Sequence, residues 1–116
     1  MINDLNRITL MGHLGADAKS QQNPPIPVTF SIATTDRWTD KNDERKTRTE
    51  WHNIVVFGGL CRYAATLKKG DRVYIEGQLR SHKYEKQIGA ESVTVTGFEV
   101  AASQIDLVAA KNENDQ

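Results

Sequence analysis

The stretch TEWHNIVVFGG, from Thr49 to Gly59, determines how the rest of the chain is interpreted. Successive side chains of a β-strand point to opposite faces, so Trp51 and Phe57 are expected on one face and Ile54 and Val56 on the other. Aromatic rings usually turn inward, because each removes a large apolar area from water. Here the aliphatic pair can fill a core by itself. We therefore expect both rings on an outer face, as a platform for a flat ligand.

The composition places few limits on function. A chain of 116 residues has the size of one domain, and its 15 basic and 15 acidic side chains neither favour nor exclude a polyanionic partner. Cys61, the single cysteine, lacks disulfide and metal-ligand partners and is expected to be a small buried residue. No apolar run has the length of a membrane span or signal peptide, so we expect a soluble cytoplasmic protein.

The N-terminal part predicts one strand and a loop. Residues 7–12 alternate, with Ile8 and Leu10 on one side. A turn is expected at 13–17. Three prolines between 18 and 27 exclude a helix and a central strand there.

A second strand is expected at 28–34, with Phe30 in the core. The charged segment 35–48 cannot be buried, so it predicts a long hairpin that projects from the domain. Trp38 lies alone among these charges. We expect it to be an exposed contact residue rather than a cover for the base of the hairpin.

After the opening stretch, apolar residues at helical spacing predict a helix of about three turns that Gly70 ends. These residues are Leu60, Tyr63, Ala64 and Leu67. From Asp71 the period returns to two, with Val73, Ile75 and Leu79 expected on the inner face. Gly77 within this strand indicates a bulge at a barrel corner.

The last part predicts a hairpin tip at 85–89 and a returning strand at 92–96 that Gly97 interrupts. The apolar residues that follow do not establish a register. Residues 111–116 are expected to be a short polar tail, leaving 1–110 as the domain. Three strands, one helix and two further strands are the order of an OB-fold, a five-stranded Greek-key barrel with a helix between strands 3 and 4.

Aromatic and basic side chains alternate on the segments expected to be exposed. The rings are Trp38, Trp51, Phe57 and Tyr84, and the basic residues are Arg37, Lys41, Arg48, Lys69, Arg72, Arg80 and Lys83. Unpaired bases expose faces that stack on aromatic rings, and phosphates bind lysine and arginine, so this combination predicts a single-stranded nucleic acid as the ligand. A duplex hides those faces.

Other functions are less well supported. The histidines (His13, His52, His82) and the aspartates of the charged hairpin (Asp36, Asp40, Asp43) show no spacing of a catalytic or metal site, so we expect no enzyme and no cofactor. A primosome-type or protein-binding OB module, which forms a dimer and binds DNA only weakly, is one alternative. A domain that binds oligosaccharides is another, although a sugar does not need so many basic neighbours.

Five segments resemble the bacterial single-stranded DNA-binding protein family, SSB. They are NRITLMGHLG (6–15), ATTDRWTDK (33–41), TEWHNIVVFG (49–58), KGDRVYIEGQLR (69–80) and the pair Lys83–Tyr84. The resemblance implies an OB-fold that assembles as a homotetramer and binds single-stranded DNA without strong sequence preference in replication, recombination and repair. It implies the same four stacking rings, with Tyr84 replacing a common tryptophan.

The resemblance also implies an oligomer interface at His52 and at the first strand, through Arg7, Thr9 and Met11. Two positions that are often basic in the family are Asn53 and Gly59 here, so weaker phosphate contacts are expected there. The family usually continues into a long linker with an acidic tip that recruits other proteins. Because this chain stops at Gln116, tail-mediated recruitment is doubtful, and the chain is either a tailless paralogue, such as a mobile-element copy, or a shortened form.

Overall fold

The computed structural model describes residues 3–20 and 27–111. Five long strands dominate it: β1 (Ile8–Leu14), β3 (Val28–Thr39), β4 (Arg45–Val56), β5 (Arg72–Ile88) and β6 (Glu91–Ala109). The shorter elements are β2 (Lys19–Ser20), the 3₁₀ turn η1 (Gly58–Leu60) and the helix α1 (Cys61–Ala64). Within the described ranges, no helix has the length and apolar character needed to cross a membrane.

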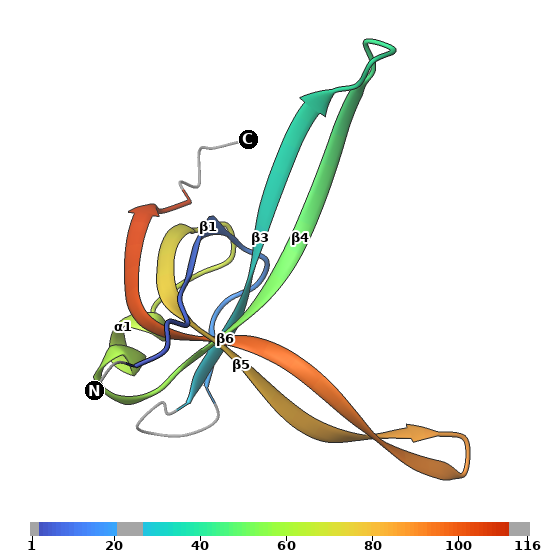
Figure 1. The fold of residues 1–116 in the computed structure, drawn as a ribbon. Helices are drawn as coiled ribbons and strands as arrows, with labels where there is room; N and C mark the ends of the chain where they lie inside the picture. Colours follow the sequence, from blue (N-terminus) through green and yellow to red (C-terminus); the bar gives the residue numbers. More distant parts are fainter. Residues whose placement is uncertain (1–2, 21–26, 112–116) are drawn as a thin grey trace.

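The strands form a closed barrel (Figure 1). They pair in the order β1-β5-β6-β4-β3, and β1 closes the ring by pairing with β3 through His13 and Leu14. All these pairs are antiparallel except β4 with β6. The predicted OB-fold is confirmed. The added strand β2 pairs only with β3, so α1 stands between β4 and β5 in this numbering.

Alternating side chains of the strands fill the barrel. Its buried residues come from all five long strands and from the segment around α1: Leu14, Val28, Phe30, Ile32, Ile54, Val56, Cys61, Ala64, Leu67, Val73, Ile75, Val100 and Ile105. The expected burial of Phe30, Ile54, Val56 and Cys61 is thus confirmed. The Cys61 thiol also donates a hydrogen bond to the carbonyl of Val56.

Two glycines allow the strands to approach closely at the corners of the barrel. A Cβ at Gly12 would overlap the carbonyl oxygen of Ala33, where β1 crosses β3. A Cβ at Gly77 would overlap the carbonyl oxygen of Ala101, where the β5–β6 register shifts. The irregularity expected at Gly77 is present, with Ser103 of β6 as the extra residue.

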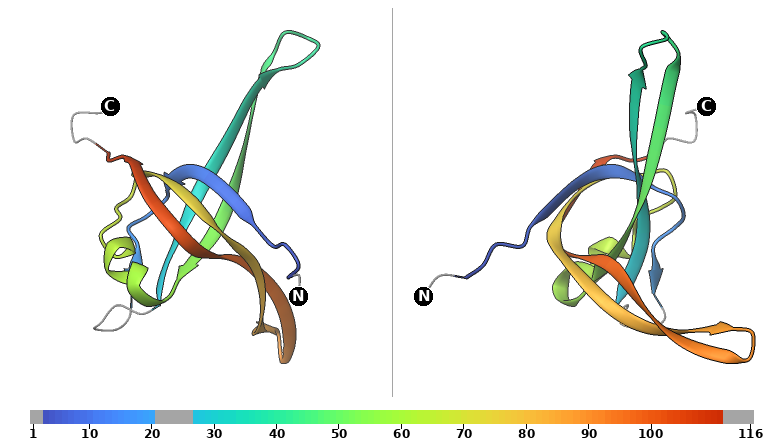
Figure 2. Two further views of the ribbon diagram at one scale, coloured as in Figure 1. Left: turned by 60° about the vertical axis from the view of Figure 1, so that its left-hand side comes forward. Right: turned by 45° about the vertical axis from the view of Figure 1, so that its right-hand side comes forward.

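Two hairpins project from the barrel as long arms (Figures 1 and 2). The β3–β4 arm confirms the projecting hairpin predicted for 35–48, although most of it is strand and only residues 40–44 form the turn. The β5–β6 arm extends in a different direction and turns at Gly89 and Ala90.

The helix is much shorter than predicted. After Ala64 the chain continues in turns bonded from residue i to i+3, in which Thr66 N donates to Tyr63 O and Leu67 N to Ala64 O. The Thr66 hydroxyl also donates to Tyr63 O at 2.6 Å, a local bond that competes with helix continuation. Leu67 is still buried, so the apolar spacing predicted its burial correctly but did not predict the length of the helix. Gly70 does not end a helix; it occupies a turn with φ +89°.

Several strand limits also differ from the predictions. His13 and Leu14 belong to β1 rather than to a turn, because they pair with β3. Gly97 does not interrupt β6, which runs continuously to Ala109, and residues 85–88 are strand rather than tip. Leu79 is exposed instead of buried: it pairs with Val100 of β6 but lies beyond Gly77, the last residue of β5 that pairs with β1. Residues 112–116, most of the expected tail, lie outside the described residues.

Replacing Gly12 with alanine should destabilise the protein. The added methyl group would press on the Ala33 carbonyl at the closure of the barrel, and overpacking of this kind typically costs about 1–3 kcal/mol. Urea unfolding followed by circular dichroism measures this loss. Gly59→Ala is the matched control, since a Cβ there has no neighbour within 4 Å. Equal stability of the two variants would contradict the closure argument.

Candidate nucleic-acid interface

The four predicted stacking rings are exposed. The exposed fraction is 48% for Trp38, 59% for Trp51, 49% for Phe57 and 46% for Tyr84, which is high for aromatic side chains in a domain with a well-filled core. The expectation that Trp51 and Phe57 stand outside the barrel is confirmed.

Strand pairing places three of these rings on one surface. The cross-strand partners Thr29, Val55, Ala101 and Gln78 form a continuous row from β3 to β5. Paired residues point to the same side of a sheet, and alternation then adds every second residue of each strand. We call the resulting set the aromatic surface; it comprises Trp51, Phe57, Arg80, His82 and Tyr84.

The contacts within the aromatic surface agree with this pairing. The Arg80 guanidinium carbon lies 5.5 Å from the centre of the Phe57 ring, within the range of a cation–π contact. The rings of His82 and Tyr84 lie 5.7 Å apart and are tilted by 33°. Both pack beside Gly97, where a Cβ would come within 3.0 Å of the His82 ring. Gly97 thus makes room for two rings on this arm.

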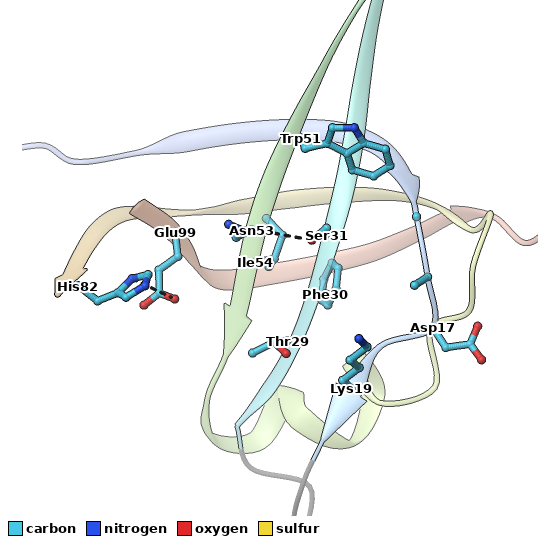
Figure 3. Close-up of a pocket in the computed structure, with 12 residues that line it drawn as sticks. Asp17, Lys19, Thr29, Phe30, Ser31, Trp51, Asn53, Ile54, His82 and Glu99 are labelled. Carbon is cyan, nitrogen blue, oxygen red and sulfur yellow. Dashed lines mark hydrogen bonds and ion pairs between the residues drawn. The ribbon is translucent and has the colours of Figure 1, made fainter. Parts of the chain in front are cut away.

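An open groove of about 510 Å³ lies beside Trp51 (Figure 3). The ring of Trp51 packs over Gly15, where a Cβ would stand 2.6 Å from ring carbon Cζ3. His82 and Glu99 of the β5–β6 arm also line the groove, and Asp17 and Lys19 line it near β2. The groove therefore extends from the barrel to the β5–β6 arm.

The floor of the groove is polar. The Ser31 hydroxyl donates to Asn53 Oδ1 at 3.1 Å, and Thr29 lies beside them. Asn53 occupies one of the positions where a basic residue was expected from the resemblance. The groove at this point offers hydrogen-bonding groups rather than positive charge.

The sequence analysis assigned no binding role to His82, Asn53 or Lys19, which all line the groove. The alternation of β5 contained a signal for His82, because it shares a face with Arg80 and Tyr84. For Asn53 the signal was its position two residues after Trp51. Lys19 could not be placed from sequence, because it enters through the short strand β2.

The β3–β4 arm carries the remaining ring and three of the predicted phosphate-binding residues. By alternation, Trp38 lies on the face of the arm opposite to Trp51. Arg37 and Lys41 are exposed near the turn. Arg48 forms an ion pair with Glu50 at 2.8 Å, but both side chains are exposed, so a phosphate can replace the carboxylate at small cost.

The other predicted basic residues are dispersed. Arg72 ends a row of cross-strand partners that runs from Trp51 through Ala33 and His13, so it lies on the same side as Trp51. Lys69 follows the helical segment, where its backbone N–H donates to Asp17 Oδ1 at 2.8 Å. Lys83 lies on the face of the β5–β6 arm opposite to Tyr84, and is thus not part of the aromatic surface.

The predicted interface residues lie on or directly before β1 and at the base of the β3–β4 arm. His52 is half-buried, and its Nε2 lies 2.8 Å from the Thr34 hydroxyl. Thr9 and Met11 are exposed, and Arg7 forms an ion pair with Glu76 at 3.7 Å. Next to Met11, the phenol of Tyr74 donates to Glu76, and this bond, together with desolvation and the negative charge of Glu76, raises the pKa of Tyr74.

Hydrogen bonds also stabilise the outer part of the β5–β6 arm. The hydroxyls of Ser92 and Thr94 donate to the carboxylate of Glu85 at 2.7 and 2.8 Å, which lowers the pKa of Glu85. In residues 3–20 and 27–111, no three His, Cys, Asp or Glu side chains gather in a way that could hold a metal ion.

Comparison with known proteins identifies the family. The sequence profile described as "Single-strand binding protein family" matches residues 5–108. The chain belongs to the single-strand binding protein family. This is a family of binding proteins, which confirms the expectation that the chain is not an enzyme.

Individual family members agree closely over the chain. It is 37% identical to a single-stranded DNA-binding protein of Neisseria meningitidis serogroup A over 95% of its own length and 63% of that relative. It is 39% identical to single-stranded DNA-binding protein 1 of Xylella fastidiosa, over 97% of this chain and 83% of the relative. The chain thus spans less than two thirds of the Neisseria protein.

Solved structures of the family have the same fold. A Plasmodium falciparum SSB in complex with ssDNA superposes with a TM-score of 0.68 and 30% sequence identity, covering 96% of this chain and 99% of the other. A deletion mutant of the single-stranded DNA binding protein from Thermus aquaticus matches in fold, with the same TM-score, 24% identity and coverage of 90% and 50%.

Replacing Gly15 with alanine should displace the Trp51 ring while leaving the barrel folded. The new methyl group would stand only 2.6 Å from Cζ3, and the ring can rotate toward solvent because it is already more than half exposed. In a Trp38→Phe background the remaining tryptophan emission should shift to longer wavelength. Gly59→Ala in the same background is the control. An unchanged emission maximum in Gly15→Ala would contradict the packing of Trp51 over Gly15.

Proposed function

We propose that this family member binds single-stranded DNA without strong sequence preference and protects it during replication, recombination and repair in the bacterial cytoplasm. The observation that carries the proposal is the aromatic surface, on which half-exposed rings and Arg80 share one side of the joined β3–β4 and β5–β6 sheets. The complex of the Plasmodium relative with ssDNA supports the same ligand class.

Stacking supplies the attraction without reading sequence. Every base has a flat face, and stacking on an aromatic side chain contributes about 1–3 kcal/mol per base. A duplex has no such face to offer, because its bases are stacked on one another. The spread of Trp51, Phe57 and Tyr84 over barrel and arm suits a flexible strand that passes over several rings in turn.

Phosphate contacts add a salt-dependent attraction. Arg80 lies against the Phe57 ring, so it is the first candidate to contact the backbone of a strand bound there. Arg72 lies on the outer face of the barrel in the cross-strand row of Trp51, so it is a candidate for a strand that passes along that row. Arg37, Lys41 and Arg48 extend along the β3–β4 arm beside Trp38, which suits a strand that continues around the arm. Lys83 lies on the opposite face of its arm and Lys69 follows the helical segment, so both would act only if the strand wraps beyond the aromatic surface.

We also propose that the chain assembles with copies of itself, as a tetramer built from dimers. Among the described residues, the Ile8–Met11 part of β1 pairs with β5 on one side and has no strand partner on the other. An open edge of this kind readily pairs with a second strand, and a copy of β1 related by a twofold axis supplies one. Met11 and Thr9 stand exposed on this strand, and half-buried His52 lies where β1 meets β3.

Trp51→Ala should weaken binding of an oligo-dT strand by about 1–3 kcal/mol without unfolding the protein, because the ring stacks on bases but stands outside the core. Fluorescence anisotropy of a labelled strand measures the affinity. Phe98→Ala is the matched control, since Phe98 is exposed on the opposite face of the β5–β6 arm. Equal losses in both variants, or tight binding of a duplex by the unmodified protein, would refute the proposed function.

Met11→Glu should lower the mass of the assembly in light scattering. A carboxylate on β1 would have to be buried without a partner between two copies, which is unfavourable. Thr47→Glu, on the exposed β3–β4 arm, should leave the mass unchanged. A Met11→Glu protein of unaltered mass would exclude β1 from the interface.

A further inference from the structure

His82 is the residue of the aromatic surface whose charge depends on protonation of an imidazole. His82 lines the groove beside Trp51, and the centre of its ring lies 5.7 Å from the centre of the Tyr84 ring. Its side chain is 44% exposed, so a ligand in the groove can reach the imidazole directly. A strand that runs from Trp51 to Tyr84 must pass over His82.

The groups that face His82 come from three elements. Glu99 of β6 is the nearest, with Oε2 at 3.9 Å from Nδ1 and only 21% of its side chain exposed. Arg80 lies two residues before His82 on the same face of β5. Across the groove, Asp17 and Lys19 carry opposite charges (Figure 3). Glu99 therefore dominates the charge beside the imidazole.

The net charge of the pair of His82 and Glu99 depends on whether the imidazole is protonated. Histidine as a residue type changes charge between about pH 5 and 8. With a neutral imidazole the pair carries one negative charge, which repels a phosphate. With a protonated imidazole the pair is neutral, and the exposed N–H groups of the ring can donate to a phosphate oxygen.

We propose that protonated His82 is a phosphate-binding residue for the strand, so that one contact of this protein with single-stranded DNA is made at acidic pH and lost at alkaline pH. The inference rests on the proposed function. A bound phosphate favours the charged imidazole, so binding takes up a proton when the surrounding pH leaves His82 mostly neutral. Affinity rises as the pH falls through this range.

Salt dependence measured at two pH values tests the proposal. Each phosphate neutralised on a single strand adds about 0.7 to the slope of log affinity against log salt. For the unmodified protein and oligo-dT, we expect a slope steeper by about 0.7 at pH 5.5 than at pH 8, so a tenfold rise in salt costs about fivefold more affinity at the lower pH. Thymine itself does not titrate there.

Three variants separate His82 from other causes. His82→Phe keeps a ring for stacking but should show the same slope at both pH values. His82→Lys should show the steeper slope at both, because its charge is permanent there. His13→Phe is the matched control: His13 is exposed on the Trp51 row beside Arg72, and its replacement should leave the pH effect intact.

The outcomes distinguish this inference from the proposed function. A pH-dependent slope that persists in His82→Phe, or that disappears in His13→Phe, would overturn the role of His82 while leaving single-strand binding in place. Equal slopes of the unmodified protein at both pH values would do the same. Absence of oligo-dT binding at either pH would instead refute the proposed function.

Discussion

The crossing of β1 over β3 is the contact on which the rest of the structure depends. The two strands can pair there only because Gly12 has no side chain to meet the Ala33 carbonyl. This pairing closes the barrel around its core and places Gly15, the residue after Leu14, against the Trp51 ring. Closure of the core and placement of the first aromatic ring are therefore consequences of one backbone contact.

The arms extend the barrel strands without extending the core. Within the barrel, alternation buries Ile32 and Ile54 on the inner face of β3 and β4. Further out the same alternation continues, but both faces meet solvent, and most side chains are charged or polar, with exposed apolar residues such as Trp38 among them. With few buried contacts, such arms open locally at lower free energy than the barrel. That freedom suits contact with a flexible ligand.

The positions of the charged residues on this protein matter more than its net charge. The net charge is zero, and acidic residues stand beside several candidate phosphate contacts: Glu50 beside Arg48, and Glu99 beside His82. The Arg48–Glu50 pair is exposed on both sides and contributes little to stability, so a phosphate competes with its carboxylate at small cost. A neutral protein can thus present a surface for a polyanion while limiting non-specific attraction.

The sequence by itself determined the barrel, because the order of its strands and helix is that of an OB-fold. It also determined the outward rings, because the period-two pattern around Trp51 assigns faces through local sterics. It also located the bulge at Gly77, since glycine within a strand often marks a bulge. Helix length and the exposure of Leu79 could not be predicted, because they depend on the Thr66 hydroxyl bond and on where β1 ends its pairing. Tertiary structure alone decided which rings and charges share a surface. The parallel pairing of β4 with β6 places Trp51 on the same surface as His82 and Tyr84, and leaves Trp38 and Lys83 on other faces. This could not be predicted, because the register between distant strands is set by packing of the whole barrel rather than by neighbours in the chain.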